Sequence, residues 1–246
     1  VRDEESRQVR KAFVPNKEDT FLLAIDYSQI ELRVLASLAK ADSMIKAFNE
    51  NVDIHTLTAS KAYGVDIDKV DSSMRRHAKA TNFGIVYGIS DWGLAEQLGI
   101  PVTEAKKFIE KYYETYPEIK TYLNDLIEGC EKNGYIKTIM NRVRYVPEIH
   151  DKNYNIREFG KRVAMNSPIQ GSAADIIKKA MIDVDNLLTS NKFKTKMILQ
   201  IHDELIFEVP LDELMIVIPL IVEKMENAVD MEVPLKVDYD YGTNWY

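Results

Sequence analysis

The chain has 246 residues, of which 46% are hydrophobic and 29% charged, so it is long enough to bury one large core or two smaller ones. It has no apolar run of the roughly 20 residues that a membrane span needs, and no apolar leader, which favours a cytoplasmic protein. The single cysteine, Cys130, excludes an internal disulfide and a thiolate metal cluster. Any metal would therefore have carboxylate or histidine ligands, and oxygen ligands favour Mg²⁺ or Mn²⁺.

The net charge of −7 is unusual for a nucleic-acid-binding protein, because phosphate groups are bound mainly by Lys and Arg. Net charge averages over the whole surface, however, and an acidic protein can carry local basic clusters. Two such clusters are Arg75, Arg76, His77 and Lys79, and further on Arg157, Lys161 and Arg162. The net charge therefore does not exclude a nucleic-acid partner.

The first element expected is a buried strand over residues 21–27, FLLAIDY, which ends at Asp26 and Tyr27. Ser28, with Glu31 three residues later, forms a capping-box pattern that predicts a helix through IELRVLASLAK. Helices are also predicted over about 54–63 and 72–87, since Gly64 and Gly88 follow as C-terminal stops.

Mostly helical structure is predicted over 103–132, where apolar and aromatic residues recur every three or four positions. The segments YIKTI and VRYV indicate a short hairpin. A long helical stretch follows and continues through AADIIKKAMIDVDNLL, with a predicted interruption near Pro168 and Gly171.

The end of the chain favours strands. KMILQIHDELIFEV predicts two strands with His202 and Asp203 at the turn, and PLKVDYDYG predicts one more. Strands near both chain ends with helices between them indicate an α+β fold, in which the ends form one sheet around a helical insertion.

Carboxylates stand at two of the predicted strand ends. Asp26 ends a buried strand, and Asp203 lies at the tip of a hairpin with Glu204 beside it. If these strands are neighbours, the carboxylates converge and can hold two divalent ions, the arrangement used for in-line phosphoryl transfer. The alternative is that Asp203 is an ordinary turn residue and Asp26 caps a strand end.

The helix within MRRHAKATNFGIVYG carries Arg75, Lys79, Phe83 and Tyr87 at intervals of four. Each step of four drifts only about 40° around a helix, so the four form one slowly winding stripe. Such a stripe can hold a triphosphate with its cations and stack a base on its aromatic rings. The alternative is a solvated basic turn followed by a pair of core aromatics.

Other polar residues occupy notable helical positions. Asn82 and Gly84 are poor helix-interior residues with no obvious structural reason to be there. Arg162, Asn166 and Gln170 recur every four residues, which suits minor-groove or sugar-phosphate contacts as well as it suits a solvated helix face.

The segments DYSQIELR, RRHAKATNFGIVYG and QIHDELIFEV occur in this order and together resemble the three signature motifs of family A DNA polymerases, of the bacterial polymerase I type. The resemblance extends through TIMNRVRYVPEI, NSPIQGSAADIIK and VPLKVDYDYGTNWY, so it covers essentially the whole sequence. It implies an α+β fold made of a palm with an antiparallel sheet and a helical fingers subdomain. The palm is expected over 1–45 and 160–246 and the fingers over 46–159, with the thumb and exonuclease domains outside this sequence.

The resemblance also implies an activity. It is DNA-templated DNA synthesis in replication and repair, in which dNTPs are added to a primer 3′-hydroxyl by two-metal phosphoryl transfer and pyrophosphate is released. The implied cofactors are two Mg²⁺ ions, with Mn²⁺ as a substitute, and the implied partners are primer-template DNA and dNTPs. The expected location is the bacterial cytoplasm, at the nucleoid. Without a thumb the chain is expected to be weakly active or inactive, and to self-associate through uncovered apolar surface.

The resemblance assigns roles to individual residues. The implied metal ligands are Asp26, Asp203 and the Tyr27 carbonyl. The implied catalytic residues are Asp26, Asp203, Glu204 and Lys79. The residues implied to face the dNTP are Gln29, Glu31, His55, Arg75, Lys79, Phe83 and Tyr87. Those implied to contact the primer-template end are Arg162, Asn166, Gln170 and His202.

Three of these roles are more specific. Glu31 and Tyr87 would close the space where a ribose 2′-hydroxyl would lie, a role compatible with Glu31 as a capping residue. Phe83, where a tyrosine can stand, implies discrimination against dideoxynucleotides. Val143 interrupts a run of three arginines that many relatives carry, so one phosphate contact is expected to be missing.

Two rival functions follow from the same residues. A single-subunit RNA polymerase shares the palm and the metal aspartates, although Glu31 and the 202–204 triplet favour DNA synthesis. A non-catalytic DNA- or partner-binding remnant is the other alternative, against which the intact Asp26, Asp203 and Arg75 argue.

Overall fold

The computed structural model describes residues 8–246, and the chain divides into two compact units. Unit 1 takes the chain up to Ile30 together with Ile176–Asp230 and Leu235–Tyr246, and unit 2 takes Glu31–Asp175 and Met231–Pro234. None of the helices in the described part of the chain is long and apolar enough to cross a membrane.

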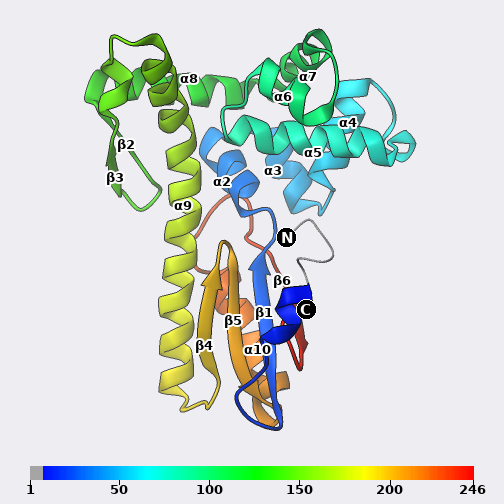
Figure 1. Ribbon diagram of the computed structural model, residues 1–246, viewed down its shortest axis with the longest axis vertical. Helices are drawn as coiled ribbons and strands as arrows, with labels where there is room; N and C mark the ends of the chain where they lie inside the picture. The colour runs from blue at the N-terminus through cyan, green and yellow to red at the C-terminus, as the bar shows by residue number, and fades with distance from the viewer. Residues whose placement is uncertain (1–7) are drawn as a thin grey trace. The chain divides into compact units, whose positions relative to one another are not determined.

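Unit 1 is built on an antiparallel sheet in the order β4-β5-β1-β6 (Figure 1). Its strands are β1 (Thr20–Tyr27), β4 (Lys196–Ile201), β5 (Glu204–Pro210) and β6 (Val237–Gly242). The predicted sheet formed by the two ends of the chain is confirmed, as is the α+β fold. A short 3-10 helix, η1 (Val9–Ala12), precedes β1.

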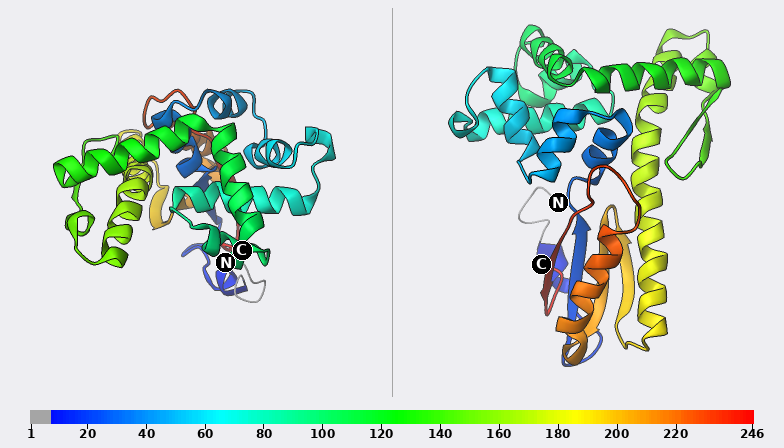
Figure 2. Two further views of the ribbon diagram at one scale, coloured as in Figure 1. Left: turned by 90° about the horizontal axis from the view of Figure 1, so that it is seen from above. Right: turned by 180° about the vertical axis from the view of Figure 1, so that it is seen from behind.

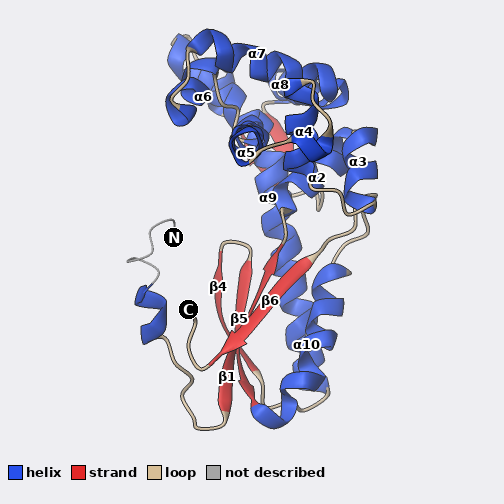
Figure 3. Ribbon diagram, turned by 90° about the vertical axis from the view of Figure 1, so that its right-hand side faces the viewer, coloured by secondary structure: helices blue, strands red, loops and turns tan. Residues whose placement is uncertain are grey.

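One face of this sheet is covered by α10 (Leu211–Glu226), as Figure 3 and the right-hand view of Figure 2 show. The helix buries Leu214, Val217, Ile218, Ile221 and Met225, and the sheet contributes buried side chains that include Leu23, Ile25 and Phe207. Burial of this apolar surface stabilises the sheet and fixes its register, because a slip of one residue would turn these side chains to the opposite face.

Unit 2 is mainly helical. Its elements are α2 (Ile30–Ala39), which begins at the unit boundary, α3 (Asp42–Asn49), α4 (Ile54–Tyr63), η2 (Ile67–Lys69), α5 (Ser72–Val86), α6 (Asp91–Leu98), α7 (Val102–Thr115), α8 (Pro117–Asn133), β2 (Tyr135–Lys137), β3 (Val143–Tyr145) and η3 (Pro147–His150). Asp53 and Asp71 cap α4 and α5 by accepting hydrogen bonds from the backbone N–H groups of Thr56 and Met74. Gly64 ends α4 at φ 69°, as expected for a glycine stop.

The predicted interruption near Pro168 and Gly171 is wrong, because α9 (Tyr154–Ser190) is a single helix of 37 residues with Pro168 inside it. Pro168 has no N–H to donate, so the helix tolerates one missing backbone donor there. The Pro168 carbonyl accepts the hydroxyl of Ser172. At Gly171 an added Cβ would lie 2.6 Å from Thr138 Cγ2, so the glycine allows close packing against the β2–β3 turn. The boundary between the two units falls within this helix, after Asp175.

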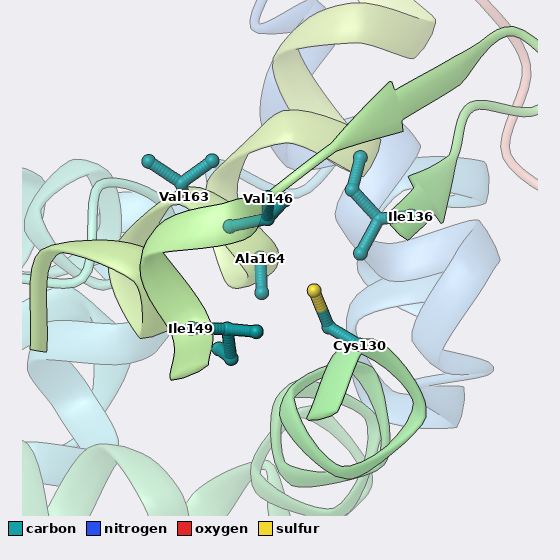
Figure 4. Packing of buried hydrophobic residues seen from close by; sticks show 6 residues of the cluster. All are labelled: Cys130, Ile136, Val146, Ile149, Val163 and Ala164. Carbon is teal, nitrogen blue, oxygen red and sulfur yellow. The ribbon is translucent and has the colours of Figure 1, made fainter. Parts of the chain in front are cut away.

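A separate core in unit 2 joins the β2–β3 hairpin to helices α8 and α9 (Figure 4). It consists of Cys130, Ile136, Val146, Ile149, Val163 and Ala164. Gly160 permits the approach of α9, since a Cβ there would lie 2.6 Å from the Ile149 backbone nitrogen. The hairpin predicted from YIKTI and VRYV is thereby confirmed and has a defined place in the unit.

Candidate active site

Three carboxylates form a row across the sheet of unit 1. Asp26 on β1 lies opposite Glu204 on β5 and opposite Asp238 on β6. Directly opposed residues of antiparallel strands place their side chains on the same face, so Glu204, Asp26 and Asp238 are neighbours there. We call these three residues the acid row. Asp26 is exposed at the end of a strand whose adjacent residues Ile25 and Tyr27 are buried.

Backbone hydrogen bonds bring Asp203 to the same end of the sheet. The Tyr27 N–H donates to the Asp203 carbonyl at 3.1 Å, and the turn between β4 and β5 lies beside the end of β1 (Figure 1). His202 in this turn has φ 53°, a strained conformation for a residue with a side chain. Gln200 Nε2 donates to the His202 carbonyl at 2.8 Å and so stabilises the tight turn.

The acid row has an excess of negative charge. Partial removal of its carboxylate from solvent is the largest cause that raises the pKa of Asp26 above its usual range, and the charges of Asp203, Asp238 and Glu204 raise it further. A bound cation would relieve this repulsion, and oxygen ligands of this kind suit Mg²⁺ or Mn²⁺. No group of three or more His, Cys, Asp or Glu side chains in metal-binding proximity occurs in residues 8–246. The predicted metal ligands are two carboxylates and one backbone carbonyl, a set that contains only two side chains of these types.

The side chain of Tyr27 is buried in the core of unit 1. Its hydroxyl donates to the Met225 carbonyl of α10 at 2.7 Å, and burial raises the pKa of Tyr27 well above its ordinary value. Only the backbone carbonyl of Tyr27 therefore suits the predicted metal role. Gln29, the other predicted residue of this segment, has φ 54° and directly precedes α2.

In unit 2 the first cation of the predicted stripe is already paired. Arg75 Nη2 donates to Asp53 Oδ2 at 2.6 Å. Burial opposes ionisation of Asp53, but the hydrogen bonds from Arg75 and Thr56 outweigh it and lower the pKa of Asp53 to about 2. Lys79, one turn further along α5, is exposed, and no ion pair of Lys79 occurs in the described part of the chain.

His55 lies inside unit 2 and is 1% exposed. Its Nδ1 is 2.9 Å from Asn82 Nδ2, and its ring is tilted by 44° against Phe83 with the centroids 5.6 Å apart. Burial is the main cause that lowers the pKa of His55 to about 4, so the ring is neutral at pH 7. His55 is therefore a neutral hydrogen-bonding group, held in place by an amide.

Glu31 and Tyr87 are brought together in unit 2. The Tyr87 hydroxyl, at the C-terminal end of α5, donates to Glu31 Oε2, in the first turn of α2, at 2.9 Å. The pair predicted to limit the space at the sugar is thus in direct contact, although its members are 56 positions apart.

The polar row on α9 has members in different surroundings. Asn166 Nδ2 donates to the Val86 carbonyl at 3.0 Å and so caps the last turn of α5. Arg162 is exposed and packs its aliphatic part near Gly88, where an added Cβ would lie 3.1 Å from Arg162 Cγ. Gln170 is partly buried. Arg162 is therefore the member best placed to meet a ligand from solvent.

Three residues of these sites were not identified from the sequence. Asp238 belongs to the acid row through strand register, and Asp53 holds Arg75. Asn82 holds His55 and accepts from Thr58 Oγ1 at 3.2 Å. Its occurrence inside a helix was the one signal visible in the sequence.

A family model described as DNA polymerase family A matches residues 1–246. The chain belongs to DNA polymerase family A. The resemblance seen in the three sequence motifs is thereby confirmed.

Individual relatives agree with this membership. DNA polymerase I of Bacillus subtilis (strain 168) is 52% identical over 246 residues, and that of Bacillus caldotenax is 51% identical over the same length. All of this chain is covered in both comparisons, but it spans only 28% of each relative. A solved structure, the POL domain of Pol1 from M. smegmatis in complex with DNA primer-template and dNTP, matches with a TM-score of 0.95 and 43% identity, covering 100% of this chain and 43% of that one.

Proposed function

We propose that this chain carries the nucleotidyl-transfer centre of a DNA-templated DNA polymerase. The enzyme adds dNTPs to a primer 3′-hydroxyl and releases pyrophosphate, in replication and repair in the bacterial cytoplasm. The observation that carries the proposal is the position of Asp26, which lies opposite Glu204 and next to the backbone of Asp203. Family membership and the DNA- and dNTP-bound M. smegmatis domain support the same function.

The proposed cofactors are two Mg²⁺ ions, for which Mn²⁺ substitutes. Asp26, Asp203 and the Tyr27 carbonyl would hold them, with Glu204 in support, because these are hard oxygen donors in a region of excess negative charge. When bound, such ions activate the attacking hydroxyl and stabilise charge on the reacting phosphate. The raised pKa of Asp26 fits this role, since repulsion between carboxylates is tolerated where a cation neutralises it.

The two cations on α5, Arg75 and Lys79, are proposed to bind the triphosphate of the dNTP. Lys79 is exposed and can bind phosphate directly. Arg75 must break its ion pair with Asp53 before it can bind a phosphate oxygen. Gln29 and neutral His55 would add hydrogen bonds, and Phe83 would stack on the nucleotide.

Sugar and DNA contacts complete the proposal. The Glu31–Tyr87 pair would exclude a 2′-hydroxyl, since a fixed hydrogen-bonded pair cannot move aside without cost. The primer-template end would meet Arg162, Asn166, Gln170 and His202. In functional terms, residues 1–45 and 160–246 serve as the palm and residues 46–159 as the fingers.

The test is primer extension by a chimera that joins this chain to the remaining segments of the Bacillus subtilis relative. Extension of a DNA primer with dNTPs and Mg²⁺, and far weaker extension with rNTPs, supports the proposal. Preferred use of rNTPs would identify an RNA polymerase instead. DNA binding without any extension would identify a binding module. The 246-residue chain alone, assayed beside the chimera, measures how much of the activity it carries by itself.

A further inference from the structure

The C-terminal tail of unit 1 returns to the acid row through Trp245. The indole Nε1–H donates to Glu204 Oε1 at 3.1 Å, although the two residues are 41 positions apart. An indole N–H is a donor only, so it can satisfy a carboxylate but not compete with it for a proton or a metal ion.

Trp245 is itself held by the segment that precedes β1. Its backbone N–H donates to the Phe13 carbonyl at 3.2 Å, and its ring meets the Phe13 ring edge-on with the centroids 5.5 Å apart. The Arg10 guanidinium lies 4.2 Å from the centroid of the indole ring. These three contacts leave the indole little rotational freedom, so the direction of its N–H is fixed.

The contact matters because Glu204 is the direct cross-strand neighbour of Asp26 in the acid row. A flexible glutamate beside two other carboxylates has several rotamers, and some of them would worsen the repulsion or block the oxygens of Asp26. A hydrogen bond to Oε1 selects one orientation and leaves Oε2 unoccupied by the indole. A cavity of about 120 Å³ is lined by Arg10, Glu204 and Trp245 among others.

We propose that Trp245 is a positioning residue that orients the Glu204 carboxylate beside Asp26 for divalent-cation binding. The proposal rests on the proposed function. Through Phe13 and Arg10, it also makes the segment before β1 part of the support of the metal site. A purely structural alternative would give Trp245 the single task of anchoring the tail.

Substitution by phenylalanine separates these alternatives. Trp245→Phe retains an aromatic ring for Phe13 and Arg10 but removes the N–H that reaches Glu204. The matched control is Trp92→Phe on α6, because Trp92 is 70% exposed and belongs to unit 2. Glu204→Met, which keeps the side-chain length and removes both carboxylate oxygens, tests the partner.

The experiment is a Mn²⁺ titration of the 246-residue chain and these variants, with free Mn²⁺ measured by electron paramagnetic resonance. Trp245→Phe is expected to weaken binding about tenfold, the scale of one lost hydrogen bond to a charged group. The double variant with Glu204→Met should bind as weakly as Glu204→Met alone, because the tryptophan acts only through that carboxylate. Trp92→Phe should bind as the unchanged chain does.

Unchanged affinity in Trp245→Phe, or losses that add in the double variant, would overturn the positioning role while leaving the metal site intact. Absence of Mn²⁺ binding by the unchanged chain would contradict the metal site and the positioning role together. A second measurement tests the contact without metal. In a Trp92→Phe background the fluorescence comes from Trp245, and Glu204→Met should shift its emission; an identical spectrum would contradict the hydrogen bond.

Discussion

Asp26 on β1 lies directly opposite Glu204 on β5, so two acidic side chains share one face at the end of a mostly buried strand. Opposed like charges destabilise a sheet. The arrangement is typical of a functional site, where stability is lost for the sake of chemistry.

Removal of one charge should therefore stabilise the chain. Folding raises the pKa of Asp26, so the charged form is disfavoured in the folded state and stability falls as pH rises above about 4, the ordinary range of an aspartate. Asp26→Asn removes this loss, and we expect a higher Tm at pH 7 in differential scanning calorimetry. Asp185→Asn, an exposed position on α9, is the control. A Tm below that of the control would contradict the repulsion.

The neutral state of His55 predicts a pH dependence at acidic pH. The pKa of His55 is lowered to about 4, so the unfolded chain takes up the proton first and stability falls as pH drops from about 6.5 to 4. The loss should reach about 3 kcal/mol at most. Urea unfolding at a series of pH values should show this slope, and His55→Gln should reduce it. The exposed His150→Gln should leave the slope unchanged.

Asp53 has two separable tasks, as N-cap of α4 and as partner of Arg75. Asp53→Asn keeps a capping side chain, whereas Asp53→Ala removes it and should cost about 1 kcal/mol more in free energy of unfolding. The partly exposed ion pair adds little. Because the pKa of Asp53 is lowered to about 2, its share of the stability is present above pH 4 and is lost between pH 4 and 2. Equal stability of the two variants at pH 7 would exclude the capping role.

The Glu31–Tyr87 pair predicts sugar selectivity. Glu31→Ala opens the space that the carboxylate fills and should raise rNTP incorporation relative to dNTP by about tenfold or more. Tyr87→Phe removes only the hydrogen bond and should have a smaller effect. The ratio of kcat/KM for the two nucleotides in the chimera measures both, with Tyr154→Phe as an exposed control. Unchanged ratios would remove the pair from the nucleotide site.

Phe83 predicts poor use of dideoxynucleotides. A hydroxyl added by Phe83→Tyr would supply a polar group near the sugar in place of the missing 3′-hydroxyl, so chain terminators should be used better. Competition between ddNTP and dNTP in primer extension measures this, with Phe159→Tyr on the exposed part of α9 as the control. If termination is the same in both variants, Phe83 does not contact the sugar side of the nucleotide.

Much of the fold could be predicted from local patterns. The hairpin around His202 and Asp203 and the helix that ends at Gly64 follow from turn and capping chemistry that lies within a few residues. The predicted interruption near Pro168 was wrong because α9 continues through the proline with Ala164 and Ile169 fully buried, so tertiary packing outweighs the cost of the missing backbone donor.

The partners of the site residues could not be predicted. Asp238 joins the acid row only through the pairing of β6 with β1, and Trp245 reaches Glu204 from the tail. Asn82 was recognisable as unusual, but its contact with His55 depends on the packing of α4 against α5. Register and tertiary packing, rather than propensity, decide such contacts.

Asp203 and Asp26 are proposed to hold the metal ions that promote phosphoryl transfer. The most direct test is primer extension by the chimera carrying Asp203→Ala, with Asp185→Asn as control and DNA binding measured in parallel. We expect the Asp203 variant to bind primer-template as the control does and to lose extension by a factor of about 1,000 or more, the scale of a missing catalytic metal ligand. Extension at the rate of the control, with DNA binding intact, would contradict the proposed function.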